Sequence, residues 1–213
     1  MPKRLVLFHL MVLLLLPAAA SAQNYLGLGL HLGAQHNVGR LSDYNRNFEV
    51  EPQNSYLIGF AFKASYRFLF LRTGVDTSFI LSRGEVLENS DPSDPVERYR
   101  ISYTQVPCFV GLNFPVQDIG EFYMGGGIAY FLGSGTVTAT SSVDIEATAL
   151  GFGFIAGIQI LITPTVRLYM EWQYLDARSE AVANTVTGPQ TWDNFYVDFS
   201  GHRMMLGLMY YVL

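Results

Sequence analysis

Residues near the C-terminal end of the chain are of the types that carry out nucleophilic catalysis. Ser200 and His202 lie two positions apart, and Asp198 precedes them. A serine hydroxyl becomes a nucleophile when a histidine lies within hydrogen-bond reach and an acid orients that histidine. Side chains two positions apart in a strand share one face, which does not by itself make a triad. We therefore assign no catalytic residue and keep this group as the one to test for acyl-group chemistry.

Six charged residues predict a different chemistry, the pairing of opposite charges inside a protein. They alternate with apolar or small neighbours: Lys63, Arg67, Arg72, Asp76, Arg167 and Glu171. An isolated charge in an interior of low dielectric is costly, so we expect these residues to form ion pairs. Such a set favours a structural plug of salt bridges over a conducting or gated pore.

The sequence shows no convincing motif for a metal or a cofactor. The acidic segment ENSDPSDP (88–95) fits no recognised calcium loop, and no Cys/His spacing typical of zinc is present. Residues 151–156 match a dinucleotide fingerprint weakly, but no strand–turn–helix unit surrounds them. We therefore expect no metal and no cofactor.

The segments that must position these residues alternate apolar side chains with small or polar ones. In YLGLGLHLGAQ (25–35), four leucines alternate with glycines and His31. This period of two predicts a β-strand, because successive side chains of an extended chain point to opposite faces. Seven further segments follow a similar pattern: 55–68, 70–80, 106–112, 122–132, 150–160, 166–175 and about 202–213.

The connections between these eight segments alternate in length. Long polar segments follow every odd strand: 37–54, 82–99, 133–147 and 176–200. Short ones follow the even strands, near 69, at 113–121 and at 163–165. The pattern is typical of a transmembrane barrel with long extracellular loops and short periplasmic turns. We predict an all-β fold, an eight-stranded antiparallel up-and-down transmembrane β-barrel.

A barrel in a membrane turns its apolar face to lipid and its small and polar face to the lumen. We expect the narrow lumen to hold glycine, charged residues and tyrosine, with no room for leucine or phenylalanine. In the last strand we favour Met204, Leu206, Leu208, Tyr210 and Val212 for the lipid face. Aromatic residues near strand ends are candidates for interfacial girdles: Tyr25, Tyr66, Phe68, Phe70, Phe114, Phe122, Trp172 and Tyr174.

One uncharged stretch, residues 147–166, is also long enough for a membrane-spanning helix. It contains Gly153 and Gly157 at the spacing of a helix-dimerisation motif. Three glycines within seven residues and the period of two favour a strand instead.

The N-terminal segment has the order of a cleavable secretory signal: basic residues, an apolar run over 5–16 and small residues up to Ala22. We expect residues 1–22 to be removed and residues 23–213 to form one domain. The formal net charge of −5 argues against nucleic acid as a partner. Cys108 is the single cysteine and cannot form an internal disulfide.

Two neighbouring segments carry a resemblance to a known family. YTQVPCFVGLNF (103–114) and FYMGGGIAYFLG (122–133) look like the strand–turn–strand of the porin-like outer-membrane β-barrel domain family. The overall plan is similar to the eight-stranded OmpA/OmpX-type barrels. The resemblance implies a location in the bacterial outer membrane, with outer-membrane lipid as a partner and the barrel-assembly machinery acting during insertion.

The function that we expect is a structural, adhesion or surface-interaction role through the four long loops, with a possible extracellular partner and no chemistry. Two alternatives stay open. One is a lipid-modifying enzyme, since the group near His202 is similar in residue types to those of lipid A deacylases and acyltransferases. The other is a narrow channel.

Overall fold

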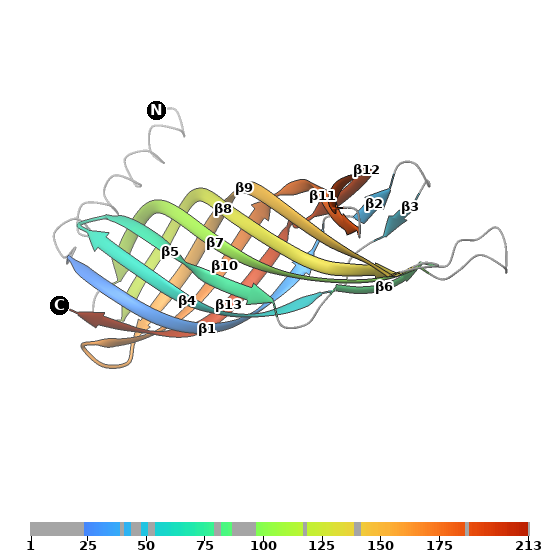
Figure 1. Cartoon of the computed structure of the whole chain (residues 1–213). Helices are drawn as coiled ribbons and strands as arrows, with labels where there is room; N and C mark the ends of the chain where they lie inside the picture. Colours follow the sequence, from blue (N-terminus) through green and yellow to red (C-terminus); the bar gives the residue numbers. More distant parts are fainter. Residues whose placement is uncertain are drawn as a thin grey trace, which may run out of the picture.

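Eight strands pair edge to edge and close into a barrel in the computed structural model of the chain (Figure 1). The structure describes residues 24–38, 41–43, 48–50, 54–78, 82–86, 97–116, 119–138, 142–185 and 188–212. The barrel strands are β1 (Tyr25–Asn37), β4 (Ser55–Tyr66), β5 (Leu69–Ser78), β7 (Glu97–Val116), β8 (Gly120–Thr138), β9 (Ser142–Leu161), β10 (Val166–Asp176) and β13 (Gly201–Val212). Each pairs with its neighbours antiparallel, and β13 closes on β1. The predicted eight-stranded antiparallel barrel is confirmed.

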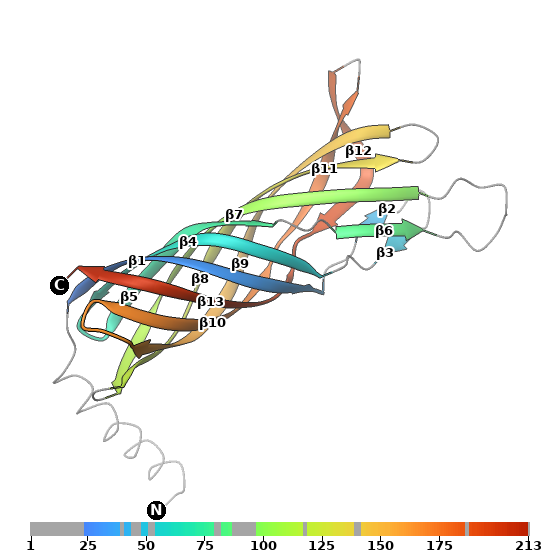
Figure 2. The ribbon, with the colours of Figure 1, turned by 90° about the horizontal axis from the view of Figure 1, so that it is seen from below.

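Five further strands continue the wall beyond the closed part: β2 (Leu41–Asp43), β3 (Phe48–Val50), β6 (Ser82–Val86), β11 (Arg178–Thr185) and β12 (Gly188–Asp198). β6 pairs with β7, β11 with β9 and β12, and β2 with β12 and β3. Figure 2 shows these strands at the end of the barrel opposite the start of β1 and the end of β13.

The four segments predicted as long loops therefore contain strands. Residues 133–138 and 142–147 belong to the paired ends of β8 and β9, and the segment 176–200 contains β11 and β12. The reason is that backbone N–H and C=O groups beyond the apolar belt still find partners on the neighbouring strand. The polar composition of these segments reflects their outward surroundings and does not prevent pairing.

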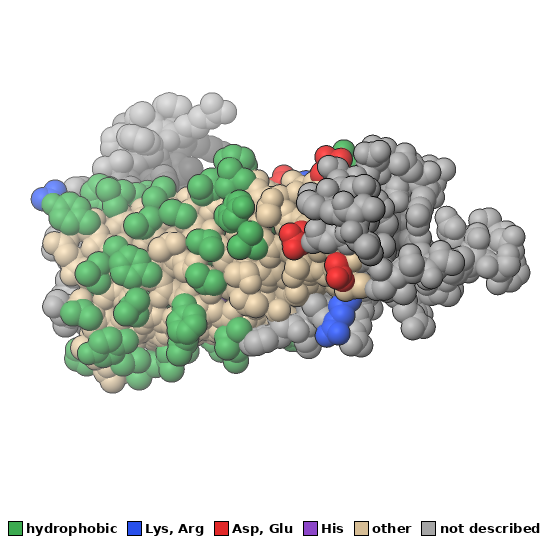
Figure 3. Space-filling model, viewed as in Figure 1, with side chains coloured by type: hydrophobic (Ala, Val, Ile, Leu, Met, Phe, Trp, Pro, Cys, Tyr) green, Lys and Arg blue, Asp and Glu red, His purple; other side chains and the backbone are tan. Residues whose placement is uncertain are grey.

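The apolar side chains of the first strand lie on the outside of the barrel, as predicted. Leu26, Leu28, Leu30 and Leu32 are 53–64% exposed, whereas His31 between them is 3% exposed. In the last strand, Met204, Leu206, Leu208, Tyr210 and Val212 are exposed and the residues between them face inward, which confirms the favoured phase. Figure 3 shows the resulting apolar side chains spread over the visible face of the wall, toward the start of β1 and the end of β13.

The expectation that the lumen excludes phenylalanine is wrong. Phe70, Phe109 and Phe131 are buried inside, and they belong to one apolar cluster that also contains Leu57 and Tyr123. Glycines on the same inward face make room for these rings, since a Cβ on Gly157 would collide with the ring of Tyr123. Two predicted girdle residues, Tyr25 and Phe70, are also buried in the lumen, so they do not lie at the membrane interface.

The helix alternative for residues 147–166 is wrong as well, since this stretch forms most of β9 and the turn that follows it. Within the described part of the chain, no helix has the length and apolar character needed to cross a membrane. The predicted signal segment, residues 1–22, lies outside the described residues.

Candidate functional site

The carboxylate of Glu121 connects four strands at the end of the lumen near the termini. Lys63 Nζ of β4 lies 2.5 Å from Glu121 Oε1, and Arg167 Nη1 of β10 lies 3.4 Å from Oε2. The hydroxyl of Tyr25 in β1 donates to Oε2. The ammonium of Lys63 also lies 3.7 Å from the ring centre of Tyr123. One carboxylate thus compensates two buried cations and ties β1, β4, β8 and β10 together.

Glu171 forms a second junction, which joins β5, β8 and β10. Arg72 Nη2 lies 3.1 Å from Glu171 Oε1. The hydroxyl of Tyr123 donates to Oε2 at 2.7 Å, and Gln173 Nε2 donates to Oε1 at 2.7 Å. Because Arg72, Glu171 and Tyr123 are each at most 1% exposed, this junction fills the lumen with a buried ion pair and the hydroxyl that donates to it.

His31 and Asp76 form a third junction across an intervening strand. His31 of β1 is in register with Gly59 of β4, which is in register with Asp76 of β5. His31 Nε2 lies 2.7 Å from Asp76 Oδ1, and His31 Nδ1 lies 2.7 Å from the hydroxyl of Tyr169. Gln105 Nε2 donates to Asp76 Oδ2 at 2.7 Å.

The six residues predicted as lumen ion pairs do not all meet there. Lys63, Arg72, Arg167 and Glu171 take part in the first two junctions, and Asp76 pairs with His31. Arg67 is a correction, because β4 ends at Tyr66 and Arg67 lies exposed in the turn to β5 with a φ of 55°. There its guanidinium lies over the ring of Tyr66, 5.4 Å from the centre. The alternation of the strand does not extend through the turn, so Arg67 leaves the inward face.

Sequence reasoning missed Glu121 and Arg203. Glu121 lies in the segment predicted as a turn, 113–121. It is two positions before Tyr123 in the same strand, so both side chains face the lumen. Arg203 directly precedes Met204, so its side chain faces the lumen when that of Met204 faces lipid. Extending each alternation to the ends of its strand would have found both residues.

The group considered for nucleophilic catalysis is divided between the two sides of the wall. Ser200 is 5% exposed, and its Oγ accepts from the N–H of Ala177 at 2.9 Å and donates to Asp176 Oδ1 at 3.1 Å. His202 is exposed on the outer surface, where its ring lies 4.9 Å from that of Tyr174. The Asp198 carboxylate accepts from the backbone N–H of Ser200, not from His202. The arrangement has no histidine base beside the serine.

The outer wall changes from apolar to polar along one row that crosses β7, β8 and β9. Leu132 of β8 is in register with Thr104 and Thr148 of the neighbouring strands. The next two rows of outward-facing residues, farther from the apolar belt, contain only polar side chains. We call them the polar extension: Arg100, Ser102, Ser134, Thr136, Asp144 and Glu146. The change coincides across three strands because the pairing register aligns them.

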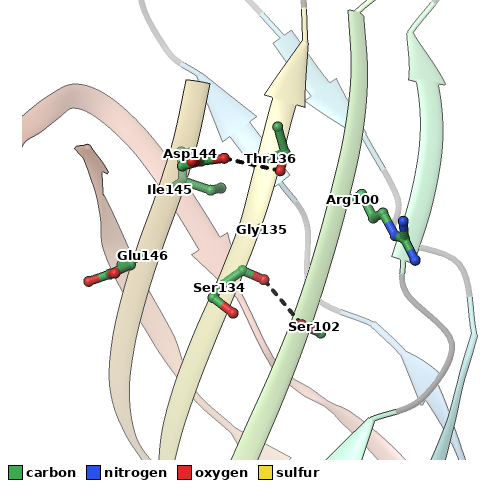
Figure 4. A pocket seen from close by; sticks show the side chains of 8 residues that line it. All are labelled: Arg100, Ser102, Ser134, Gly135, Thr136, Asp144, Ile145 and Glu146. Atoms are coloured by element: carbon green, nitrogen blue, oxygen red, sulfur yellow. Dashed lines mark hydrogen bonds between the residues drawn. The ribbon is translucent and has the colours of Figure 1, made fainter. Parts of the chain in front are cut away.

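The polar extension surrounds a hollow of about 520 Å³, to which Gly135 and Ile145 also contribute (Figure 4). Thr136 Oγ1 donates to Asp144 Oδ1 at 3.3 Å, and Ser102 Oγ donates to the carbonyl oxygen of Ser134 at 3.4 Å. In Figure 4, Arg100 lies on one side of the hollow and Glu146 on the other. Hydroxyl, carboxylate and guanidinium groups thus line one surface beyond the apolar belt.

Solved structures share this fold at low sequence identity. The outer membrane protein OprG from Pseudomonas aeruginosa matches with a TM-score of 0.62 and 12% identity, over 90% of this chain and 97% of that one. A major outer membrane protein from Thermus thermophilus matches with a TM-score of 0.52 and 14% identity, over 88% and 99% of the two chains. Fold likeness of this kind does not decide function. A comparison with curated proteins found no match.

A family model identifies the fold further. The model described as the outer membrane protein beta-barrel domain matches residues 7–210, almost the whole chain. The protein is therefore an integral protein of the bacterial outer membrane, and its exposed apolar belt is the surface that contacts lipid. The chain belongs to the outer membrane protein β-barrel domain family.

Proposed function

We propose that the protein is a non-enzymatic surface protein that does not conduct and that interacts with extracellular partners through the polar extension. The observation that carries the proposal is the polar hollow of about 520 Å³, which directly adjoins the lipid-contacting belt. In outer-membrane barrels the longer connections face the outside of the cell. The end with β2, β3, β6, β11 and β12 has these longer connections, so we assign it to the extracellular side.

The filled lumen supports a role without conduction. The Glu121 and Glu171 junctions lie at successive levels, and the ring of Tyr123 lies between them. The residues that form them are buried, so a solute would have to separate ion pairs to pass. Separating a buried ion pair without replacement partners is strongly unfavourable.

The chemistry of the polar extension suits a saccharide. Carboxylates and hydroxyls exchange hydrogen bonds with sugar hydroxyls, and one guanidinium supplies several donors. The hollow is lined by two carboxylates, Asp144 and Glu146, and across β8 by the guanidinium of Arg100. We assign a glycan displayed at a cell surface as the partner.

The test uses the purified protein in nanodiscs, applied to an array of bacterial and host glycans. Asp144→Ala and Arg100→Ala should each weaken binding by about tenfold, which corresponds to the loss of about one hydrogen bond to a charged group. Thr148→Ala is the matched control, because Thr148 is outward on β9 but does not line the hollow. Equal binding by all four proteins, or no glycan bound by the unaltered protein, would contradict the proposal.

A further inference from the structure

Arg203 is a fully buried cation that has no carboxylate partner among the described residues. It is 0% exposed and lies in the lumen toward the extracellular end. Its Nε donates to Gln35 Oε1, which also accepts from the hydroxyl of Tyr103. Both terminal nitrogens, Nη1 and Nη2, are buried without an acceptor. The guanidinium therefore has four N–H donors unused.

The carboxylates of the lumen are occupied elsewhere. Asp76 accepts from Gln105 and contacts His31, Glu121 contacts Lys63 and Arg167, and Glu171 contacts Arg72. The buried charged residues, histidine apart, are four cations and three carboxylates: Lys63, Arg72, Arg167 and Arg203 against Asp76, Glu121 and Glu171. The described lumen thus carries one positive charge in excess, and Arg203 is the cation left over.

Aromatic rings surround the guanidinium but do not replace the hydrogen-bond acceptors that its terminal N–H groups lack. Arg203 Cζ lies 5.0 Å from the ring centre of Phe131 and 5.8 Å from that of Tyr103. Phe199 packs against both rings. A ring face attracts a cation, but this attraction is weaker than the cost of removing an unpaired charge from water. The surroundings call for a counter-ion.

We propose that Arg203 anchors a binding site for a small monovalent anion, a halide or the carboxylate of a small organic acid. The anion accepts hydrogen bonds from Nη1 and Nη2 and neutralises the excess charge of the lumen. The size limit follows from Tyr103, Phe131 and Phe199, each of which is at most 7% exposed. This site is separate from the polar extension and does not depend on the proposed surface function.

The test measures the unfolding midpoint of the full-length barrel in zwitterionic lipid vesicles by tryptophan fluorescence in urea. Chloride or acetate replaces gluconate, a large anion, at constant ionic strength. A ligand that binds only the folded state raises stability with the logarithm of its concentration once that concentration exceeds Kd. The unaltered protein should therefore show a midpoint that rises in this way with chloride, with acetate, or with both, relative to gluconate, and the arm that responds identifies the anion.

Two variants remove the need for an anion in different ways. Arg203→Met removes the charge and Gln35→Glu places a carboxylate on the residue that already accepts from Arg203 Nε. Both should lose the anion response, and Gln35→Glu keeps the test valid if Arg203→Met does not fold. Arg67→Met, a change at an exposed arginine in the turn between β4 and β5, should respond like the unaltered protein.

Two results would overturn the proposal. One is an unaltered protein whose midpoint is the same in chloride, acetate and gluconate, which would leave water as the partner of Arg203. The other is an anion response that Gln35→Glu retains in full, which would indicate anion binding elsewhere on the barrel.

Discussion

His31 Nε2 and Asp76 Oδ1 lie 2.7 Å apart although their strands, β1 and β5, are separated by β4. The residue between them in register is Gly59. A side chain at this position would occupy the space in which the imidazole and the carboxylate meet. The glycines of the inward face are therefore part of the interior contacts, because they allow side chains of non-adjacent strands to reach one another.

Gly59→Ala should destabilise the barrel by about 1–3 kcal/mol, the usual effect of inserting a methyl group into a filled interior. The added Cβ would collide with Asp76 Oδ1 and His31 Nε2. The measurement is the free energy of unfolding in urea, with the protein in lipid vesicles. Gly126→Ala is the control, since a Cβ there meets nothing nearer than 3.6 Å, and its effect should stay within about 0.5 kcal/mol. Equal effects of the two changes would show that the space at Gly59 is not needed.

Glu121→Gln should be more destabilising than Lys63→Met. Removing the carboxylate leaves Lys63 and Arg167 buried without an anion, and the loss of one partner of a buried pair costs about 3–5 kcal/mol. Lys63→Met leaves Glu121 paired with Arg167, whose Nη1 lies 3.4 Å away.

The comparison uses the same urea titration, with Glu146→Gln, an exposed carboxylate on β9, as a control of little effect. The opposite order, with Lys63→Met the more destabilising, would show that Glu121 is not the centre of the junction.

The purified protein should show no steady single-channel conductance in planar bilayers, because the two carboxylate junctions fill the lumen. Glu171→Ala removes one carboxylate but leaves Tyr123 and the Glu121 junction in place, so it should be silent too. Regular conductance steps from the unaltered protein would contradict the non-conducting role.

Ser200→Ala and His202→Ala should leave the lipid A of expressing cells unchanged in mass spectra. The Ser200 hydroxyl is hydrogen-bonded to Ala177 and Asp176 inside the wall, whereas His202 lies outside beside Tyr174. Cells without the protein supply the reference spectrum. A lipid A species that depends on the protein and disappears in either variant would establish the enzyme alternative.

The strand segments and the faces of most strands could be predicted because they depend on local order in the chain. Alternation along 25–35 decides which side chains share a face, and the excess of leucine on one face with glycine on the other indicates which face meets lipid. The structure confirms the lipid-facing side of the first strand and of the last strand, in which Met204 faces outward and Arg203 inward.

The pairs inside the lumen depended on the tertiary structure, because pairing partners are distant in sequence. Lys63 meets Glu121 across 58 positions, and no alternation pattern indicates that distance. Arg67 lies outside the lumen because β4 ends at Tyr66, two residues earlier than the pattern suggested.

The sequence by itself determined that the chain forms outward-apolar strands, since side-chain alternation is a property of each strand alone. Only the tertiary structure decided which inward groups meet and which, like the terminal nitrogens of Arg203, do not. The physical reason is that closure of the barrel sets the register between strands, and the register brings particular charges together.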